Sequence, residues 1–265
     1  MDIRFFNFAG FTIAIRFEET LYPAFEKDFK ENILAAYQGF AIEKPTKKPH
    51  FTIDVTTREN VETIVRKKEG KYFVNYYEEK NKSKGITYYF ISRLQFELII
   101  RKVMHNLLES NDGFLLHASG SVIDNKAYLF LADAGGGKST IARLLLNHYT
   151  RLSDDTVVIR KQNSKFYVHR TPLREKRPQS EKMPGMFPLG KIFFIHKNPE
   201  LQIEKLEDKE IILSKFLKQG FFLQKEGMRN KIYWAFDFVK QWSEFYDLSY
   251  GLQNFNRVIE LLQRI

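Results

Sequence analysis

The sequence predicts a mixed α/β protein in which a smaller α+β region, residues 1–111, precedes an α/β domain, residues 112–265. Short runs rich in β-branched and aromatic residues recur along the chain, and helical spacing of apolar residues appears between some of them. One strand-like run leads through a glycine-rich loop into a helix. The 265 residues are enough for one large domain or two modest ones, each with a buried core.

In the first region, residues 23–37 carry apolar side chains at helical spacing, with Phe25, Phe29 and Ile33 on one face. A second helix is expected over residues 92–108, where Ser92 is a suitable N-cap. The pattern as a whole indicates a β-meander covered by a helix. The strands are expected at residues 13–17, 51–55, 63–66, 72–77 and 86–91.

In the second region, residues 124–126 (Asp-Asn-Lys) fit the tight turn of a β-hairpin. The Pro-rich stretch at residues 172–188 is expected to be a long loop. Helices are predicted at residues 139–146, 213–218, 228–244 and 254–263. Strands are predicted at residues 114–117, 120–123, 127–131, 156–160, 165–169 and 191–196.

The composition narrows the classes of function. The net charge of +10 favours an anionic partner, although scattered lysines are equally typical of a solvated surface. No aromatic and basic motif of a nucleic-acid module is present, so we do not expect nucleic acid as the partner. The absence of cysteine excludes disulfides and cysteine-based metal sites. Without a signal-like start or a membrane-length apolar run, a cytoplasmic location away from the membrane is expected.

The strongest motif is the loop at residues 132–140, Ala-Asp-Ala-Gly-Gly-Gly-Lys-Ser-Thr. It matches the end of the phosphate-loop pattern G-x-x-x-x-G-K-[ST], with Ala132 in place of the first glycine. Successive glycines let several N–H groups converge on phosphate oxygens, and the following helix adds positive charge at its N-terminus. We therefore expect ATP as the ligand and Mg²⁺ as its companion. The expected nucleotide-binding residues are Ala134, Gly135, Gly136, Gly137, Lys138, Ser139 and Thr140.

Within that loop, Lys138 is expected to contact the β- and γ-phosphates, and the hydroxyl of Ser139 to ligate Mg²⁺. Asp154 and Asp155 follow the loop helix directly before a strand. Phosphoryl transfer needs one carboxylate for the metal and one for the proton of the attacking hydroxyl, but adjacent aspartates are also common at solvated surfaces. His117 lies in an apolar run, where a histidine is more often a satisfied core residue than a catalytic one.

Together, these features resemble the HPr kinase/phosphorylase family and its shorter kinase relatives, which include lasso-peptide kinases. The resemblance covers residues 114–160, FLLHASGSVIDNKAYLFLADAGGGKSTIARLLLNHYTRLSDDTVVIR. His117 precedes Lys138 by 21 residues, as a histidine does in that family. The family usually has Gly and Ser where this chain has Ala132 and Ala134, and its spacing from the lysine to the aspartate pair is one residue longer.

The resemblance implies a strongly bent, mixed sheet like that of phosphoenolpyruvate carboxykinases. It implies Asp154 as the catalytic carboxylate, Asp155 as its metal-side neighbour and His117 as a residue close to the reacting phosphate, so that the catalytic set is Asp154, His117 and Lys138. The metal ligands would be Ser139 and Asp155. Full-length relatives form hexamers, so a homo-oligomer is compatible with the resemblance.

The function expected is an ATP-dependent serine kinase acting on a peptide or protein hydroxyl, with a precursor peptide as one candidate acceptor and residues 1–111 recruiting it. Two alternatives remain open from the sequence. One is a kinase of a small molecule such as free serine, or a diphosphate-using enzyme. The other is a nucleotide-binding switch that transfers nothing. An arginine of the basic run at residues 170–177 is a further candidate for clamping phosphates or acceptor.

Overall fold

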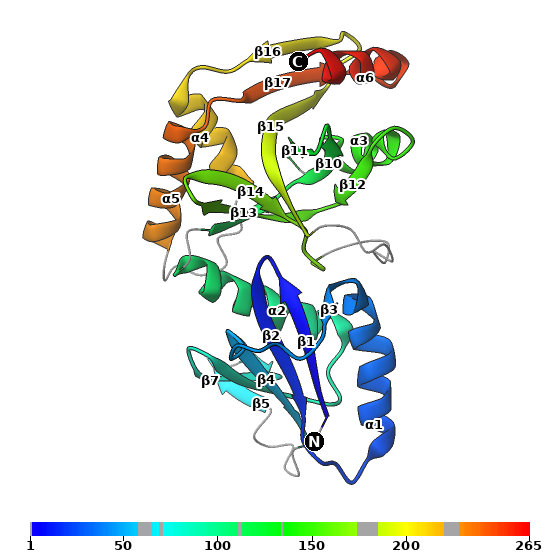
Figure 1. Cartoon of the computed structure of the whole chain (residues 1–265), viewed down its shortest axis with the longest axis vertical. Coiled ribbons are helices and arrows are strands. Elements are labelled where there is room, and N and C mark those ends of the chain that lie inside the picture. The colour runs from blue at the N-terminus through cyan, green and yellow to red at the C-terminus, as the bar shows by residue number, and fades with distance from the viewer. Residues whose placement is uncertain are drawn as a thin grey trace. The chain divides into compact units, whose positions relative to one another are not determined.

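The computed structural model describes residues 2–57, 65–68, 71–110, 113–133, 135–173, 185–219 and 228–265. The chain forms two compact units that divide between Leu107 and Leu108. Unit 1 is the N-terminal one and unit 2 the C-terminal one (Figure 1).

Unit 1 is built on a six-stranded sheet with the order β3-β1-β2-β4-β8-β7. Its strands are β1 (Asp2–Phe8), β2 (Phe11–Phe17), β3 (Ala41–Ile42), β4 (Phe51–Thr56), β7 (Tyr77–Asn81) and β8 (Lys84–Tyr88). A separate pair is formed by β5 (Val65–Lys68) and β6 (Lys71–Val74). The prediction of a meander is wrong, because β4 pairs in parallel with both β2 and β8. The helical segment between β2 and β4 acts as a crossover that carries the chain back to the same end of the sheet.

That crossover is one helical run that changes its winding along its length. It passes from α1 (Pro23–Asp28) through the π-helical η1 (Phe29–Ile33) to the 3₁₀-helical η2 (Leu34–Phe40). The long helix α2 (Arg93–Glu109) follows the sheet. The core between these elements is aromatic, with edge-to-face contacts of Phe29 on Phe17, Tyr89 and Phe96. Phe25, expected on the buried face, is exposed instead.

Unit 2 is a mixed α/β unit organised around the long strand β15 (Met186–Lys197), which curves through the sheet (Figure 1). β15 pairs in parallel with β11 and β17 and, near its start, antiparallel with β14. The main path of the sheet is β12-β10-β11-β15-β14-β13-β9. Its strands are β9 (Gly113–His117), β10 (Ser119–Ile123), β11 (Lys126–Leu131), β12 (Thr150–Ser153), β13 (Thr156–Gln162), β14 (Lys165–His169), β15, β16 (Gln202–Lys205) and β17 (Phe245–Tyr250).

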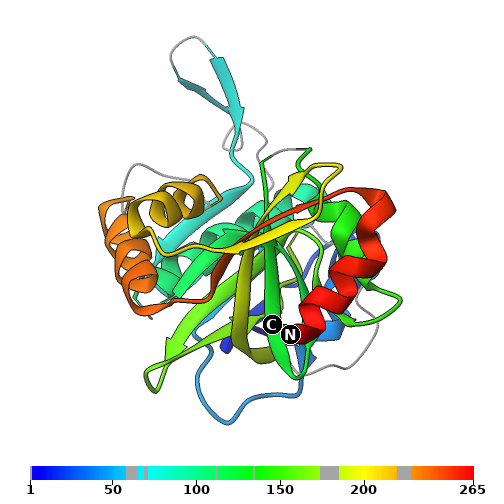
Figure 2. The same ribbon diagram turned by 90° about the horizontal axis from the view of Figure 1, so that it is seen from above.

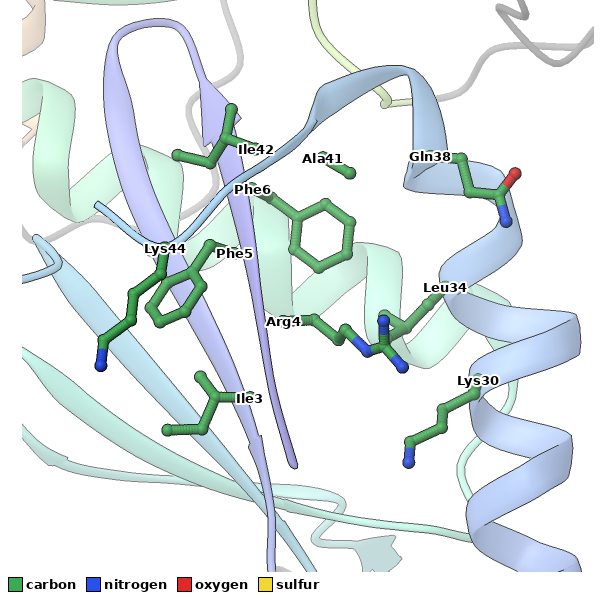
Figure 3. Close-up of a pocket in the computed structure, with 10 residues that line it drawn as sticks. All are labelled: Ile3, Arg4, Phe5, Phe6, Lys30, Leu34, Gln38, Ala41, Ile42 and Lys44. Atoms are coloured by element: carbon green, nitrogen blue, oxygen red, sulfur yellow. The ribbon is translucent and has the colours of Figure 1, made fainter. Parts of the chain in front are cut away.

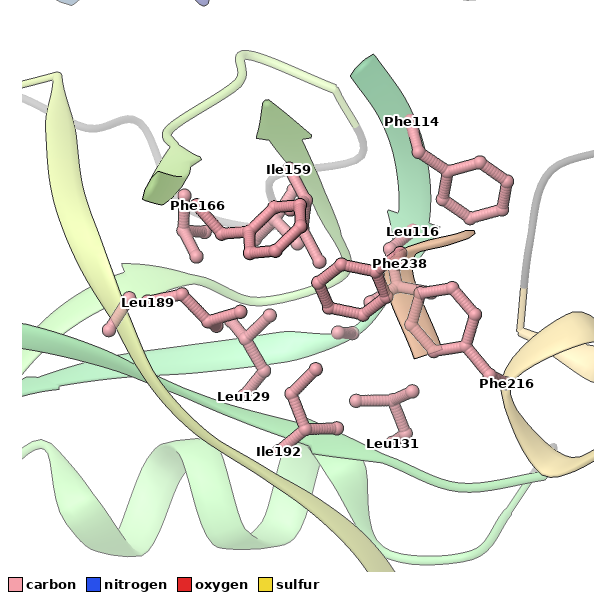
Figure 4. Packing of buried hydrophobic residues seen from close by; sticks show 14 of the residues in the cluster. Phe114, Leu116, Leu129, Leu131, Ile159, Phe166, Leu189, Ile192, Phe216 and Phe238 are labelled. Carbon is pink, nitrogen blue, oxygen red and sulfur yellow. The ribbon is translucent and has the colours of Figure 1, made fainter. Parts of the chain in front are cut away.

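Helices lie on opposite sides of this sheet (Figure 2). A buried cluster of side chains lies on each side. One joins the strands to α4 (Lys209–Lys218) and α5 (Met228–Gln241), and Figure 4 shows Phe216 and Phe238 within it. The other joins the strands to α3 (Lys138–Leu145) and α6 (Phe255–Arg264) through side chains such as Ile141 and Val258. The sheet is therefore covered by helices on both faces, and its edges and strand ends are left for the functional groups.

Most elements expected in unit 2 are confirmed within a few residues, including the hairpin turn, where Asp124 and Asn125 both have positive φ. The short strands β12, β16 and β17 were not expected. Only part of the expected loop at residues 172–188 can be compared with the structure, because residues 174–184 lie outside the described residues. Its last three residues are not loop but the first residues of β15, which pair with β14.

Candidate functional site

The glycine-rich loop connects the end of β11 to the first residue of α3. Gly135 and Gly137 have φ of +77° and +109°, a region that favours glycine. A Cβ on Gly136 would lie 2.7 Å from the Cβ of Ala132, so the methyl group of Ala132 itself requires glycine there. Strand, turn and helix thus follow one another in the order that the sequence predicted. Ala134 lies outside the described residues.

Lys138 begins α3, and its ammonium group turns back into the loop. Its Nζ donates to the carbonyl oxygens of Ala132 and Asp133. The side chain is buried, and this burial lowers the pKa of Lys138 below its usual value, while the carboxylates of Asp155 and Asp133 offset part of the effect. The ammonium is therefore held at the loop by neutral carbonyls and lies within the electrostatic reach of Asp155.

The first turn of α3 is anchored from two sides. The buried hydroxyl of Ser119, on β10, donates to the carbonyl oxygen of Lys138 at 3.2 Å. The hydroxyl of Tyr250, at the end of β17, lies 3.5 Å from the carbonyl oxygen of Gly137. Burial raises the pKa of Tyr250 to about 12, so this hydroxyl stays protonated as a donor. Ser139 is exposed and Thr140 half-buried in the same turn, where helix N–H groups attract anions.

His117 and Asp155 are brought together by the pairing of β9 with β13, in which His117 lies opposite Thr156. Nδ1 of His117 lies 3.0 Å from the carbonyl oxygen of Asp155 and 3.3 Å from its carboxylate Oδ2. Both partners are acceptors, so Nδ1 carries a proton and is the donor in this contact. The hydroxyl of Thr156 also donates to Oδ2 of Asp155, at 3.0 Å.

Asp154, the other member of the pair, has a different environment. Its Oδ2 accepts from the guanidinium of Arg151 at 2.9 Å, and both side chains are 15% exposed. The turn between β12 and β13 separates the two carboxylates. The buried hydroxyl of Ser153 fixes that turn by accepting from the N–H groups of Asp155 and Thr156. The structure therefore places Asp155, rather than Asp154, with His117 and near Lys138.

Sequence reasoning missed several residues that hold this site. Gln219, the residue after α4, donates from Nε2 to Oδ1 of Asp133 at 3.2 Å, and its carbonyl accepts from the N–H of His117 at 2.8 Å. Gln219 thus ties the loop to the histidine strand, and no local pattern marks it. No local sequence pattern marks Tyr250 or Ser119 either. Ser153, directly before the aspartate pair, is the one whose position could have indicated a side-chain-capped turn.

Of the three arginines in the basic run, the structure describes Arg170. Arg170 is buried, and its N–H donates to the carbonyl of Gly185. Arg174 and Arg177 lie outside the described residues. Within the described ranges, no three His, Asp or Glu side chains cluster as a ready-made metal site. Nucleotide-bound Mg²⁺ uses few protein oxygens, so hard donors such as the Ser139 hydroxyl and the Asp155 carboxylate suit it.

A protein-family model described as "SynChlorMet cassette protein ScmC" matches residues 89–230, which is more than half of the chain. The chain belongs to the ScmC family. The part matched to ScmC includes His117, the glycine-rich loop, both aspartates and Gln219. It ends before Tyr250.

The other comparisons give less information about this ScmC-family chain. No curated protein matches it. A solved structure titled "Structure of the Hpr(Ser) kinase/phosphatase from Coxiella burnetii" is similar over 57% of this chain and 93% of that one, with 14% identity and a TM-score of 0.32. A similarity of that size defines neither fold nor activity. No helix in the described ranges is both long and apolar enough to cross a bilayer.

Proposed function

We propose that this protein transfers the γ-phosphate of ATP to a hydroxyl group of a peptide or protein, as a serine or threonine kinase. The observation that carries the proposal is the contact between His117 and Asp155 beside Lys138 at a glycine-rich loop. A loop that only binds nucleotide needs the lysine and the amides. Here a carboxylate also lies next to that lysine, and a histidine and a threonine orient it. This carboxylate can act as a proton acceptor.

In the proposed reaction, the acceptor oxygen forms a bond to the γ-phosphorus as the bond from that phosphorus to the β,γ-bridging oxygen breaks. The acceptor proton passes to Asp155, and ADP leaves. Lys138 neutralises negative charge on the phosphates once it exchanges its loop carbonyls for phosphate oxygens. The geometry favours Asp155 over Asp154 as the proton acceptor, because Asp154 is engaged by Arg151.

Mg²⁺ bound with the nucleotide would neutralise phosphate charge and orient the triphosphate. Ser139, exposed in the first turn of α3, is the residue proposed to ligate it, together with phosphate oxygens. The carboxylate of Asp155 acts electrostatically on Lys138 and is available to the same ion, directly or through water.

A groove on unit 1 supports a peptide as the acceptor (Figure 3). The groove measures about 650 Å³ and lies between β1, β3 and the helical crossover. Arg4, Lys30 and Lys44 line it, and Asp2 forms ion pairs with the first two. Ile3 and Ile42 give the groove apolar surface. Strand β3 pairs with β1 only at Phe5 and Phe6, so the first residues of β1 present a sheet edge that an extended acidic peptide can extend.

The test is transfer of label from γ-labelled ATP in the presence of Mg²⁺. The acceptors are serine- and threonine-containing acidic peptides and, separately, free serine. We expect labelled peptide with the wild type and a loss of about 10²-fold or more with Asp155→Asn. Asp154→Asn is the matched control and should retain most of the activity. Lys138→Ala should weaken ATP binding itself.

Other results would redirect the proposal. Label on free serine alone would identify a small-molecule kinase. ATP binding without transfer to any acceptor would indicate a nucleotide switch. An Asp154→Asn variant that loses more activity than Asp155→Asn would reverse the roles proposed for the two carboxylates. Unchanged nucleotide affinity in Lys138→Ala would refute the phosphate loop as the binding site.

A further inference from the structure

A pocket of about 380 Å³ lies beside the phosphate loop in unit 2. It is lined by Thr140, by residues 197–199 at the end of β15 and by residues 250–253 at the end of β17. Thr140 lies two positions after Lys138 in the first turn of α3. Tyr250 lines the pocket and also reaches the carbonyl oxygen of Gly137. The pocket therefore shares its wall with the loop, and neither His117 nor Asp155 lines it.

The position of the pocket fits the direction in which a bound nucleotide must run. In a phosphate loop the lysine contacts the β- and γ-phosphates, and the amides of the loop and first helical turn hold the α- and β-phosphates. Lys138 and Asp155 mark the γ-phosphate end of the site. Thr140, beyond Ser139, marks the end from which the ribose and base leave the loop, and that is where the pocket opens.

The pocket also has the composition of a nucleoside site. Leu252 is 66% exposed, Pro199 is exposed next to it, and both present apolar surface to a flat ring. Asn198 and Gln253 bring amide groups that can donate to or accept from a base or a ribose. Its volume is in the range of small-molecule pockets, which combine apolar walls with a few polar groups.

Lys197 adds a cation on the side of the pocket that faces the loop. Its Cε lies 3.7 Å from the position that a Cβ on Gly137 would take. Among the described residues, no carboxylate forms an ion pair with Lys197 within 4.0 Å. Lysine side chains are long and rotatable, so its ammonium can reach a phosphate held over Gly137.

Hydrogen bonds join the two walls of the pocket in this structure. The side-chain amides of Gln253 and Asn254 both donate to the carbonyl oxygen of Pro199, at 3.1 and 2.6 Å. The N–H of Asn198 donates to the carbonyl of Tyr250 at 3.1 Å. A pocket whose walls are already linked loses little conformational freedom when a ligand enters.

We propose that this pocket binds the ribose and base of the nucleotide whose triphosphate occupies the loop, and that Lys197 contacts its phosphates from the pocket side. This inference rests on the proposed function, because it takes the loop to hold a triphosphate. It adds a location for the nucleoside and a second phosphate-binding lysine, on a strand end far from the loop in sequence.

The test compares ATP with inorganic tripolyphosphate by calorimetry on the full chain. ATP should bind at least about tenfold more tightly than tripolyphosphate, because only ATP fills the pocket. Leu252→Ser should weaken ATP about five- to tenfold and leave tripolyphosphate unchanged. Lys197→Gln should weaken both ligands and reduce their salt dependence. The matched controls are Leu94→Ser, equally exposed at 66%, and Lys165→Gln at an exposed site, neither of which lines the pocket.

A second measurement uses the wild-type protein, so its result does not depend on whether a variant folds correctly. Wild-type protein labelled with 8-azido-ATP should carry the cross-link within residues 197–199 or 250–253. Equal affinity for ATP and tripolyphosphate, or cross-links confined to other segments, would overturn the pocket assignment and leave the loop proposal intact. Binding of neither ligand would refute the loop proposal and the pocket assignment together.

Discussion

The Nδ1 atom of His117 and the carboxylate Oδ2 of Asp155 are 3.3 Å apart, although the residues belong to strands far apart in the sequence. A histidine that donates through Nδ1 orients the carboxylate and stabilises its charge. We expect His117→Ala to reduce phosphoryl transfer about 10²-fold while leaving ATP affinity within about twofold. Single-turnover transfer and calorimetry measure the two effects.

The control for this prediction is His148→Ala, at an exposed position after α3. Its activity should equal that of the wild type. A His117→Ala variant that transfers phosphate at the wild-type rate would show that the histidine only packs against the turn.

Gly137 combines a φ of +109° with a close neighbour, since an added Cβ would lie 3.3 Å from the Tyr250 hydroxyl. We expect Gly137→Ala to cost about 1–3 kcal/mol of stability through backbone strain and to weaken ATP binding at least about tenfold. Gly185→Ala is the control, because that glycine has open space around it and no positive φ. Thermal unfolding and calorimetry provide the readouts, and a Gly137→Ala variant with unchanged affinity would contradict the loop geometry.

His169 should make the protein sensitive to acid. Burial, together with the charge of Arg160, lowers the pKa of His169 to about 4, and its Nε2 has no recorded hydrogen-bond partner in the described part of the chain. Above pH 6.5 the residue is neutral in both folded and unfolded states. Between pH 6.5 and pH 4, His169 binds a proton in the unfolded state but stays largely neutral in the folded state. Stability should therefore fall as the pH drops, by about 3 kcal/mol at most.

Urea unfolding across this pH range checks the prediction. In His169→Leu the decline between pH 6.5 and pH 4 should be shallower than in the wild type. The exposed His148→Leu should keep the wild-type slope. Parallel pH profiles for wild type and His169→Leu would rule out His169 as the source of the acid sensitivity.

Phe216 holds α4 against the sheet of unit 2. It is fully buried, and its ring lies 5.5 Å from that of Phe114 and 5.2 Å from that of Phe238. We expect Phe216→Ala to lower the free energy of unfolding by about 3–5 kcal/mol. Phe236→Ala, at a position 55% exposed on α5, should change it by less than about 1 kcal/mol. Chemical denaturation distinguishes these outcomes, and similar losses in both variants would contradict the packing.

The elements with strong local signals could be predicted from the sequence. The run from Leu129 through Gly137 into α3 has a strand pattern, a turn composition and a helix start in sequence order, and the turn at Asp124 has its own chemistry. Strand pairing had no such signal. The parallel pairing of β2 with β4 depends on a crossover, and a short strand such as β17 is too brief for its periodicity to stand out.

The same limit applies to the site. Motif spacing indicated His117, Lys138 and Asp155, and the contact of His117 with Asp155 follows from the pairing of β9 with β13. The sequence could not say which of the two adjacent aspartates turns toward the histidine, because that depends on the turn held by Ser153. Gln219 and Tyr250 reach the loop from helix and strand ends remote in sequence, so only tertiary structure reveals them.

The position of β15 has a consequence for the order in which unit 2 folds. The hairpins β10–β11 and β13–β14 form between neighbours in the chain, whereas β11 needs β15 and β15 needs β17, both synthesised later. Distant pairings form slowly because the intervening chain must first be closed into a loop. On the ribosome, then, the glycine-rich loop emerges well before β15 and β17. We expect a refolding chain to recover its hairpins first and its nucleotide affinity last.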